Sequence, residues 1–150
     1  MEYIDLIEKA IKMMDFSYAP YSHFHVGAAL LCQTENCRDG DGEGIKSAKK
    51  VFTGCNIENA AFGPSNCAER TAVFKAVSEG YRKFEAICIV GGAENAEKKV
   101  EIKDYCPPCG VCRQVLAEFC TKDFKIILAK SKTEYKIFTL GELLPESFSL

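Results

Sequence analysis

The chain has 150 residues, of which 47% are apolar and 27% charged, as expected for one globular domain over residues 1–150. No apolar run is long enough to cross a bilayer, so we expect no membrane partner. The formal net charge of −2 argues against nucleic acid as a partner, because proteins that bind nucleic acid usually carry a basic excess or a basic stripe.

The first half of the chain predicts one helix and two strands. Apolar residues at helical spacing predict an amphipathic helix over residues 2–15. The apolar run 26–32 predicts a buried strand, and a second strand follows at 51–57. Residues 33–50 are polar and contain glycines among acids and lysines, so we predict a long solvated loop inserted between these two strands.

The second half of the chain continues the alternation of helices and strands. Asn66 suits an N-cap and Glu69 follows three residues later, as in a capping box, so we expect a helix that ends at about Glu79. The remaining elements are a strand at 86–90, a helix at 110–119 and a hairpin of strands at 125–129 and 135–139. This order predicts an α/β protein with three layers, α/β/α, around a mixed five-stranded sheet whose last two strands form a hairpin.

Nine cysteines are a high count for a chain of this length. An odd number cannot pair completely, and residues 1–5 carry acids where a secretory leader would carry bases. In a reducing compartment, clustered cysteines more often bind metal or take part in chemistry. We therefore expect a cytoplasmic protein in which some of the cysteines are metal ligands.

Two short motifs contain the residues suited to catalysis. Cys67 precedes Glu69 by two residues, and Cys109 and Cys112 form a C-x-x-C pair after a proline. We expect all three cysteines in the first turn of a helix, where free N–H groups and the helix dipole favour a thiolate. Three protein ligands leave a fourth position for water, as in a catalytic zinc site. The sequence therefore predicts one zinc ion per chain, with Glu69 close enough to lie beside it without being a ligand.

The charge of three thiolates predicts further participants around the metal. Three thiolates make a zinc centre negative and therefore a poor Lewis acid. Arg70, next to Glu69, could donate hydrogen bonds to the sulfurs and withdraw this charge, and Gln114 is a second candidate for the same role.

Two other metal sites fit the same cysteines. Cys106, Cys109 and Cys112 also read C-x-x-C-x-x-C, as in iron–sulfur proteins, although such a module gives Glu69 no role. A closed structural zinc site that uses Cys106 as a fourth ligand is a second alternative.

Four segments of the chain form a longer pattern. They are Tyr18-Ala19-Pro20-Tyr21-Ser22-His23-Phe24 with Val26-Gly27-Ala28-Ala29, Thr53-Gly54-Cys55-Asn56-Ile57-Glu58-Asn59-Ala60, Cys67-Ala68-Glu69-Arg70-Thr71-Ala72, and Pro108-Cys109-Gly110-Val111-Cys112-Arg113-Gln114. In this order and spacing they resemble the small zinc-dependent cytidine deaminases of pyrimidine salvage over nearly the whole chain. The resemblance implies that the predicted α/β/α domain is cytidine-deaminase-like and that the protein is a hydrolase.

The resemblance also implies a binding site for a small-molecule nucleoside. In this family, the residues at the positions of Asn56 and Glu58 hydrogen-bond the ribose, and the residue at the position of Phe24 packs near the nucleoside. Ala68 is a further implied contact with the substrate. The C-terminal aromatic residue, here Phe148, enters a neighbouring subunit's site and stacks on the base, which implies a homotetramer with shared active sites.

The implied reaction is hydrolytic deamination of cytidine and 2′-deoxycytidine to uridine and 2′-deoxyuridine, with release of ammonia, by a zinc-bound hydroxide that attacks C4. Glu69 would act first as the base and then as the acid. Deaminases of tRNA, of single-stranded nucleic acid or of a cytosine-bearing antibiotic are alternatives. Asn56 and Glu58 favour a free nucleoside, because a hydrogen-bonded ribose 3′-hydroxyl leaves no room for a phosphodiester.

Overall fold

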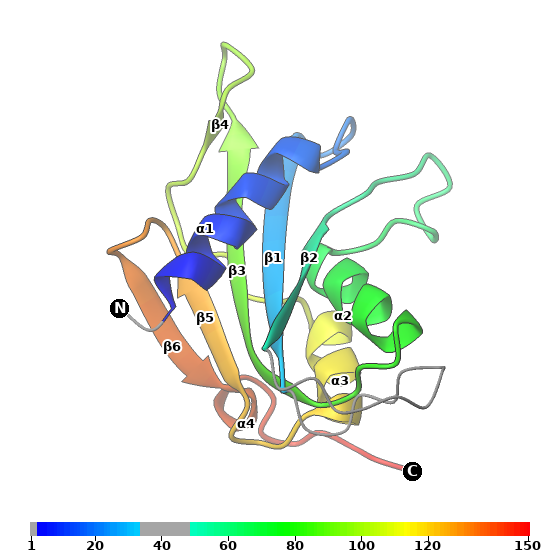
Figure 1. Ribbon diagram of the computed structural model, residues 1–150. Helices are drawn as coiled ribbons and strands as arrows, with labels where there is room; N and C mark the ends of the chain where they lie inside the picture. The colour runs from blue at the N-terminus through cyan, green and yellow to red at the C-terminus, as the bar shows by residue number, and fades with distance from the viewer. Residues whose placement is uncertain (1–2, 34–48) are drawn as a thin grey trace.

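The computed structural model of the protein describes residues 3–33 and 49–150 (Figure 1). The predicted polar loop at 33–50 therefore lies almost entirely outside the described residues. The elements in chain order are α1 (Ile4–Met13), the 3₁₀ turn η1 (Met14–Phe16), β1 (Phe24–Cys32), β2 (Lys50–Cys55), α2 (Ala68–Ser78), β3 (Phe84–Glu94), β4 (Val100–Glu101), α3 (Gly110–Phe119), β5 (Lys125–Ala129), β6 (Tyr135–Thr139) and α4 (Leu140–Leu143).

The strands form one mixed sheet. Its order is β2-β1-β3-β5-β6, with the short strand β4 paired to the end of β3. Strands β3 and β5 are parallel, while the other pairs are antiparallel, and β5 and β6 form the predicted hairpin. The sheet has six strands and not the predicted five, because β4 is a two-residue strand within the charged linker, too short to give an alternating apolar pattern.

Helices cover both faces of the sheet, which confirms the three-layer α/β/α arrangement. Helix α1 packs on one face, and α2 and α3 pack on the other (Figure 1). Alternate residues of β1 enter the two cores: Ala28 and Leu30 face α2 and α3, while Ala29 faces α1. Because the central strands are buried on both sides, their middle residues, 26–32 of β1 and 86–93 of β3, are continuously apolar and show no polar alternation.

Two glycines allow helices to lie against the backbone of the sheet. A Cβ on Gly27 would lie 1.9 Å from the carbonyl oxygen of Ala10 in α1. A Cβ on Gly54 would lie 2.3 Å from the carbonyl oxygen of Ala68 and 2.6 Å from the amide nitrogen of Ala72, both in α2. Gly54 therefore fixes how closely the start of α2 approaches β2.

Helix α2 begins one residue later than the sequence predicts, and the predicted Asn66 capping box is wrong. Cys67 is the N-cap residue, and Asn66 instead forms a backbone bridge with Ile57, with N–O distances of 2.9 and 3.0 Å. The Asn66 side chain donates to the Thr71 hydroxyl at 3.2 Å. Pairing with Ile57 holds Asn66 in extended backbone, so the helix starts after it.

Within residues 3–33 and 49–150, no helix has the length and apolar character needed to cross a membrane.

Candidate active site

Three cysteine sulfurs converge where α2 and α3 begin. Cys67 and Cys109 are the N-cap residues of α2 and α3, and Cys112 lies in the first turn of α3. The sulfur of Cys109 lies 3.8 Å from that of Cys67 and 3.5 Å from that of Cys112. In the described part of the chain, these three residues are the only group of three or more side chains close enough to hold a metal ion together.

The chemistry of this donor set fits zinc. Three soft sulfur donors suit Zn²⁺, and a group of three leaves a fourth coordination position for a water molecule. Cys112 is buried while Cys109 is exposed, so the group is anchored in the core and is also reachable from solvent. This combination is typical of a catalytic zinc site more than of a closed structural one.

The surroundings of Cys67 stabilise its thiolate. Hydrogen bonds from Cys112 and then from Arg70 lower the pKa of Cys67 to about 5. The guanidinium Nη2 of Arg70 lies 3.1 Å from the Cys67 sulfur. The hydrogen bond with Cys67 raises the pKa of Cys112, since two adjacent thiolates would repel each other. Binding of a divalent cation would replace this shared proton.

Glu69 is a buried carboxyl beside the sulfurs. Its side chain is only 4% exposed, and it is the single buried charged residue of the described chain. Burial, together with the negative charge of Cys67, raises the pKa of Glu69 to about 7. A carboxyl group with a pKa near neutrality can both accept and donate a proton, as a residue that acts as base and acid must.

Cys106 lies next to the site, but its sulfur does not join the other three. It sits over Gly91 of β3, since a Cβ at Gly91 would lie 2.7 Å from it. Burial, and then the charges of Glu69 and Cys67, raise the pKa of Cys106 to about 12, so it remains a thiol. The geometry therefore does not favour a closed site of four cysteines or the iron–sulfur motif that begins at Cys106.

Asn56 and Glu58 lie just beyond the end of β2, and they bond to the start of β1 and to the segment before it. The Asn56 amide accepts from the backbone N–H of Val26 and donates to the carbonyl of Phe24, both at 2.8 Å. Glu58 accepts from the amides of Tyr21 (2.9 Å) and Ser22 (3.2 Å) and from the Ser22 hydroxyl. The hydroxyl hydrogen bond, with the two amides, holds the pKa of Glu58 below its usual value.

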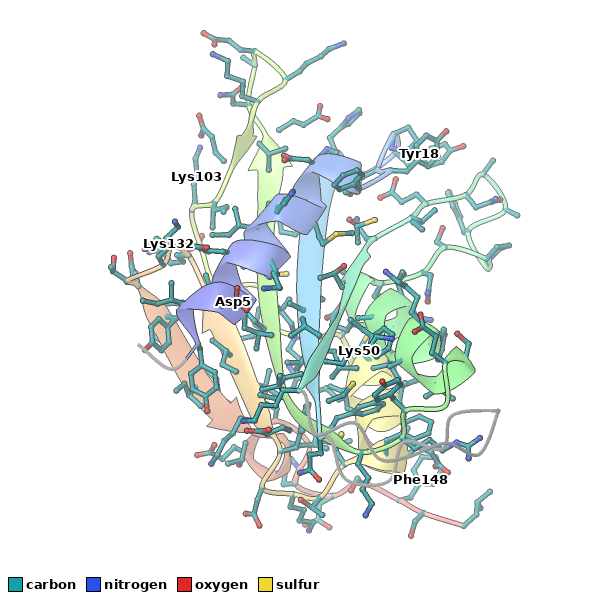
Figure 2. The ribbon with its side chains drawn as sticks, viewed as in Figure 1. Asp5, Tyr18, Lys50, Lys103, Lys132 and Phe148 are labelled. Carbon is teal, nitrogen blue, oxygen red and sulfur yellow. The ribbon has the colours of Figure 1, made fainter. Side chains whose placement is uncertain are left out.

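The remaining predicted residues have different surroundings. Phe24 begins β1 and is 39% exposed, whereas Ala68 is fully buried in the first turn of α2. Gln114 donates to the backbone carbonyl of Phe148 at 3.1 Å, so its contact is with the C-terminal tail. The Phe148 ring is 69% exposed. The backbone of Tyr18 exchanges hydrogen bonds with the backbone of Asn56 and Glu58. In Figure 2, Tyr18 lies at the opposite end of the molecule from Phe148.

Arg113, near the site, makes contacts that the sequence does not predict. Arg113 donates to the carbonyl of Pro108 at 2.8 Å and to that of Leu143 at 2.6 Å, so it ties the start of α3 to the C-terminal helix. Both acceptors are backbone carbonyls, and Leu143 is thirty residues away in sequence, so no local pattern could have identified this contact.

Comparison with known proteins agrees with this geometry. A profile of the cytidine and deoxycytidylate deaminase zinc-binding region matches residues 1–128. A cytidine deaminase of Halalkalibacterium halodurans is 44% identical over 96% of this chain and 92% of its own length, and one of Sporosarcina psychrophila is 41% identical over 99% and 93%.

The fold comparison gives the same family. The crystal structure of a cytidine deaminase from Burkholderia pseudomallei superposes with a TM-score of 0.76 at 39% identity, covering 99% of this chain and all of that one. A cytidine deaminase from Mycobacterium tuberculosis superposes with a TM-score of 0.71 at 32% identity, covering 100% and 99%. The sulfur group, the fold and these relatives together show that the chain belongs to the zinc-binding cytidine and deoxycytidylate deaminase family.

Proposed function

We propose that this protein is a zinc-dependent cytidine deaminase, which hydrolyses cytidine and 2′-deoxycytidine to uridine and 2′-deoxyuridine and releases ammonia. The observation that carries this proposal is the group of three sulfurs at two helix starts beside the buried carboxyl of Glu69. Cys67, Cys109 and Cys112 would hold one zinc ion per chain. Zinc at this position supplies a Lewis acid that lowers the pKa of a bound water toward neutrality.

Glu69 carries the protons of the reaction. It accepts a proton from the attacking water and delivers it to N3 of the cytosine ring, which makes C4 more electrophilic. The water oxygen bonds to C4, and the bond from C4 to the amino nitrogen breaks. Glu69 gives the proton from the water oxygen to the departing amino group, which leaves as ammonia. Its burial supports this role, since a pKa of about 7 lets one carboxyl act in both directions.

Arg70 would moderate the negative charge of the sulfurs. Its guanidinium already lies 3.1 Å from the sulfur of Cys67. Cys67 and Cys109 also cap the N-termini of α2 and α3, where the helix dipoles favour negative charge. Withdrawal of charge from the sulfurs would leave the zinc a stronger Lewis acid toward water.

Asn56 and Glu58 would bind the ribose, with Phe24 against the rest of the nucleoside, whereas the fully buried Ala68 offers no exposed surface to it. The position of Glu58 supports this, because the Ser22 hydroxyl and two backbone amides lower the pKa of its carboxyl group and hold it just beyond the end of β2. The Asn56 amide fixes the first residues of β1, where Phe24 lies. A ribose hydroxyl would thus meet polar groups that are already oriented.

We also propose a homotetramer in which Phe148 completes the site of a neighbouring subunit. The ring is largely exposed, and it lies far from Tyr18 at the other end of its own subunit (Figure 2). Exposed aromatic side chains also gather on the segments that flank Asn56 and Glu58, where a second subunit would cover them: Phe16, Tyr18, Tyr21 and Phe62. A cytoplasmic location fits the same proposal, because sulfur ligands must stay reduced to hold zinc.

The test of substrate class is a panel of four compounds on the purified zinc-loaded protein. Cytidine and 2′-deoxycytidine should both be deaminated, because both keep the ribose 3′-hydroxyl. Free cytosine should be poor because polar groups of the site are left unpaired. Cytidine 3′-phosphate should be poor because its phosphate meets the charge of Glu58.

Glu58→Ala is the matched variant for this panel. It should lower kcat/KM for cytidine and narrow the preference for cytidine over cytosine, because the lost contact involves only the sugar. Deamination of single-stranded oligonucleotides as efficient as that of cytidine would overturn the assignment to free nucleosides.

A further inference from the structure

Gly91 has no space for a side chain, and the neighbouring atoms belong to Cys106, beside the sulfur group, and to Phe24. It lies in β3 opposite Val26 of β1 and faces the layer of α2 and α3. A Cβ at this position would lie 2.7 Å from the Cys106 sulfur, 2.9 Å from the Cys106 Cβ and 2.9 Å from Cε1 of Phe24. Non-bonded carbon atoms normally stay about 3.5–4.0 Å apart, so only glycine fits this arrangement.

These contacts join two parts of the site across one strand. Cys106 belongs to the segment that leads into α3 and ends at Cys109. Phe24 begins β1, where the Asn56 amide holds the backbone. The empty position at Gly91 therefore lets the Phe24 ring pack against β3 beside the segment that leads to Cys109, the N-cap residue of α3.

We infer that Gly91 is a positioning residue for the deamination, and that its missing side chain sets where the Phe24 ring stands against the nucleoside. This inference rests on the proposed function. It does not require Gly91 to touch the substrate, because the contact is made by the ring.

The surroundings show how an alanine at this position would be accommodated. Two of the three close atoms are the Sγ and Cβ of Cys106, and a Cβ moves only with its backbone, whereas the third lies on the ring of Phe24. Phe24 and Gly91 also line a cavity of about 320 Å³, which gives the ring room to move. Gly91→Ala should therefore displace the Phe24 ring and shift Cys106 by a small distance, while the sheet remains intact.

The experiment compares Gly91→Ala with the parent protein in steady-state kinetics on cytidine. We expect KM to rise about tenfold, the scale of one lost aromatic contact. The dissociation constant of uridine, measured by calorimetry, should rise by a similar factor because this product is not turned over. Turnover should change less than about threefold, and zinc content should stay at one per chain. Gly63→Ala is the control, since a Cβ there would meet only the Ala61 carbonyl oxygen, at 3.9 Å.

A double-mutant cycle with Phe24→Ala separates positioning from general damage. If Gly91 acts through the ring, Gly91→Ala should change KM by less than about twofold once the ring is absent. Two results would overturn the inference: an unchanged KM in Gly91→Ala, or an equal rise in KM with and without the Phe24 ring. Loss of zinc from Gly91→Ala would also overturn it, since the segment before Cys109 would then have moved instead. If the parent protein itself does not deaminate cytidine, the proposed function fails, which is a different result from all of these.

Discussion

Cys67 and Glu69 are two residues apart, yet their surroundings favour opposite protonation states. Hydrogen bonds from Cys112 and Arg70 lower the pKa of the Cys67 thiol to about 5. Burial raises the pKa of the Glu69 carboxyl to about 7. A thiolate and a carboxyl that can hold a proton are thus produced at the start of one helix.

Glu58 gives a prediction for the dependence of stability on pH. Its folded-state pKa is lowered by the Ser22 hydroxyl and by the amides of Tyr21 and Ser22. A lowered pKa means that the ionised form stabilises the fold above the unfolded value of about 4.5 and that this stabilisation is lost as the pH falls through the folded-state pKa. Glu58→Gln should therefore lower Tm at neutral pH, and the difference from the parent should shrink in acid.

Thermal unfolding of both proteins across this range measures the effect. Glu118→Gln, which removes an exposed acid of α3, controls for the loss of one negative charge. A difference in Tm between Glu58→Gln and the parent that stays constant down to strongly acidic pH would contradict the assigned hydrogen bonds.

The sequence is sufficient to predict the sulfur group but not its immediate neighbours. Local spacing predicts Cys67, Cys109 and Cys112 at the starts of helices. A residue at the start of a helix lies beside the free N–H groups of the first turn wherever that helix packs. The contact of Cys106 with Gly91 depends instead on how the segment before α3 crosses β3. Such a crossing has no local pattern, so Gly91 could not be singled out from the sequence.

On the scale of elements, the placement of α2 on β2 determines the geometry of the site. Helix α2 provides Cys67 at its N-cap and Glu69 in its first turn. Gly54 lets the backbone of this helix approach the strand without a side chain between them. Gly27 does the same for α1 on the other face of the sheet, away from the sulfurs.

Gly54→Ala and Gly27→Ala form a matched pair for this claim. Each adds a methyl group against helix backbone, so each should lower the free energy of unfolding by about 2–3 kcal/mol. Only Gly54→Ala moves α2, so it should also weaken zinc binding and slow turnover. Zinc affinity and turnover, measured on the folded fraction after size-exclusion chromatography, should stay near the parent values in Gly27→Ala. Equal loss of zinc in both variants would show that the approach of α2 to β2 is not what positions the site.

The sequence predicts most of the elements, but not all of their bounds: the strand predicted at 86–90 extends over Phe84–Glu94, and the strand predicted at 51–57 ends at Cys55. The helix at Gly110–Phe119 and the hairpin of β5 and β6 have the predicted bounds, because each has a clear period and clear turn residues. Strand β4 has two residues and forms only because the linker returns to the end of β3. The start of α2 is shifted because Asn66 pairs with Ile57, a contact between segments that sequence spacing does not encode.

On the scale of the whole molecule, Phe148 in the C-terminal tail lies far from Tyr18, whose backbone bonds to Asn56 and Glu58 (Figure 2). Gln114 and Arg113 attach the tail to α3 through backbone carbonyls, which leaves the Phe148 side chain free to meet another surface. The exposed ring therefore supports a site that is completed only by assembly.

Deletion of residues 147–150 tests this assembly. KM for cytidine should rise about tenfold through loss of the aromatic contact, while zinc content should stay at one per chain. Deletion of Leu150 alone is the control, because it keeps Phe148. Mixing the truncated chain with full-length Glu69→Gln should recover a low KM in hybrid assemblies, since the intact tail then serves the neighbour's site. A fully active monomer in light scattering would contradict the shared site.

The most direct test of the account is Glu69→Gln, with zinc content and uridine formation measured on the same preparation. Glutamine has nearly the same shape as glutamate and is not needed as a ligand, so zinc should remain near one per chain. Turnover should fall by several powers of ten, on the order of the combined loss of a general base and a general acid. A zinc-loaded Glu69→Gln protein that converts cytidine to uridine at nearly the parent rate would contradict the central claim that this buried carboxyl carries the protons.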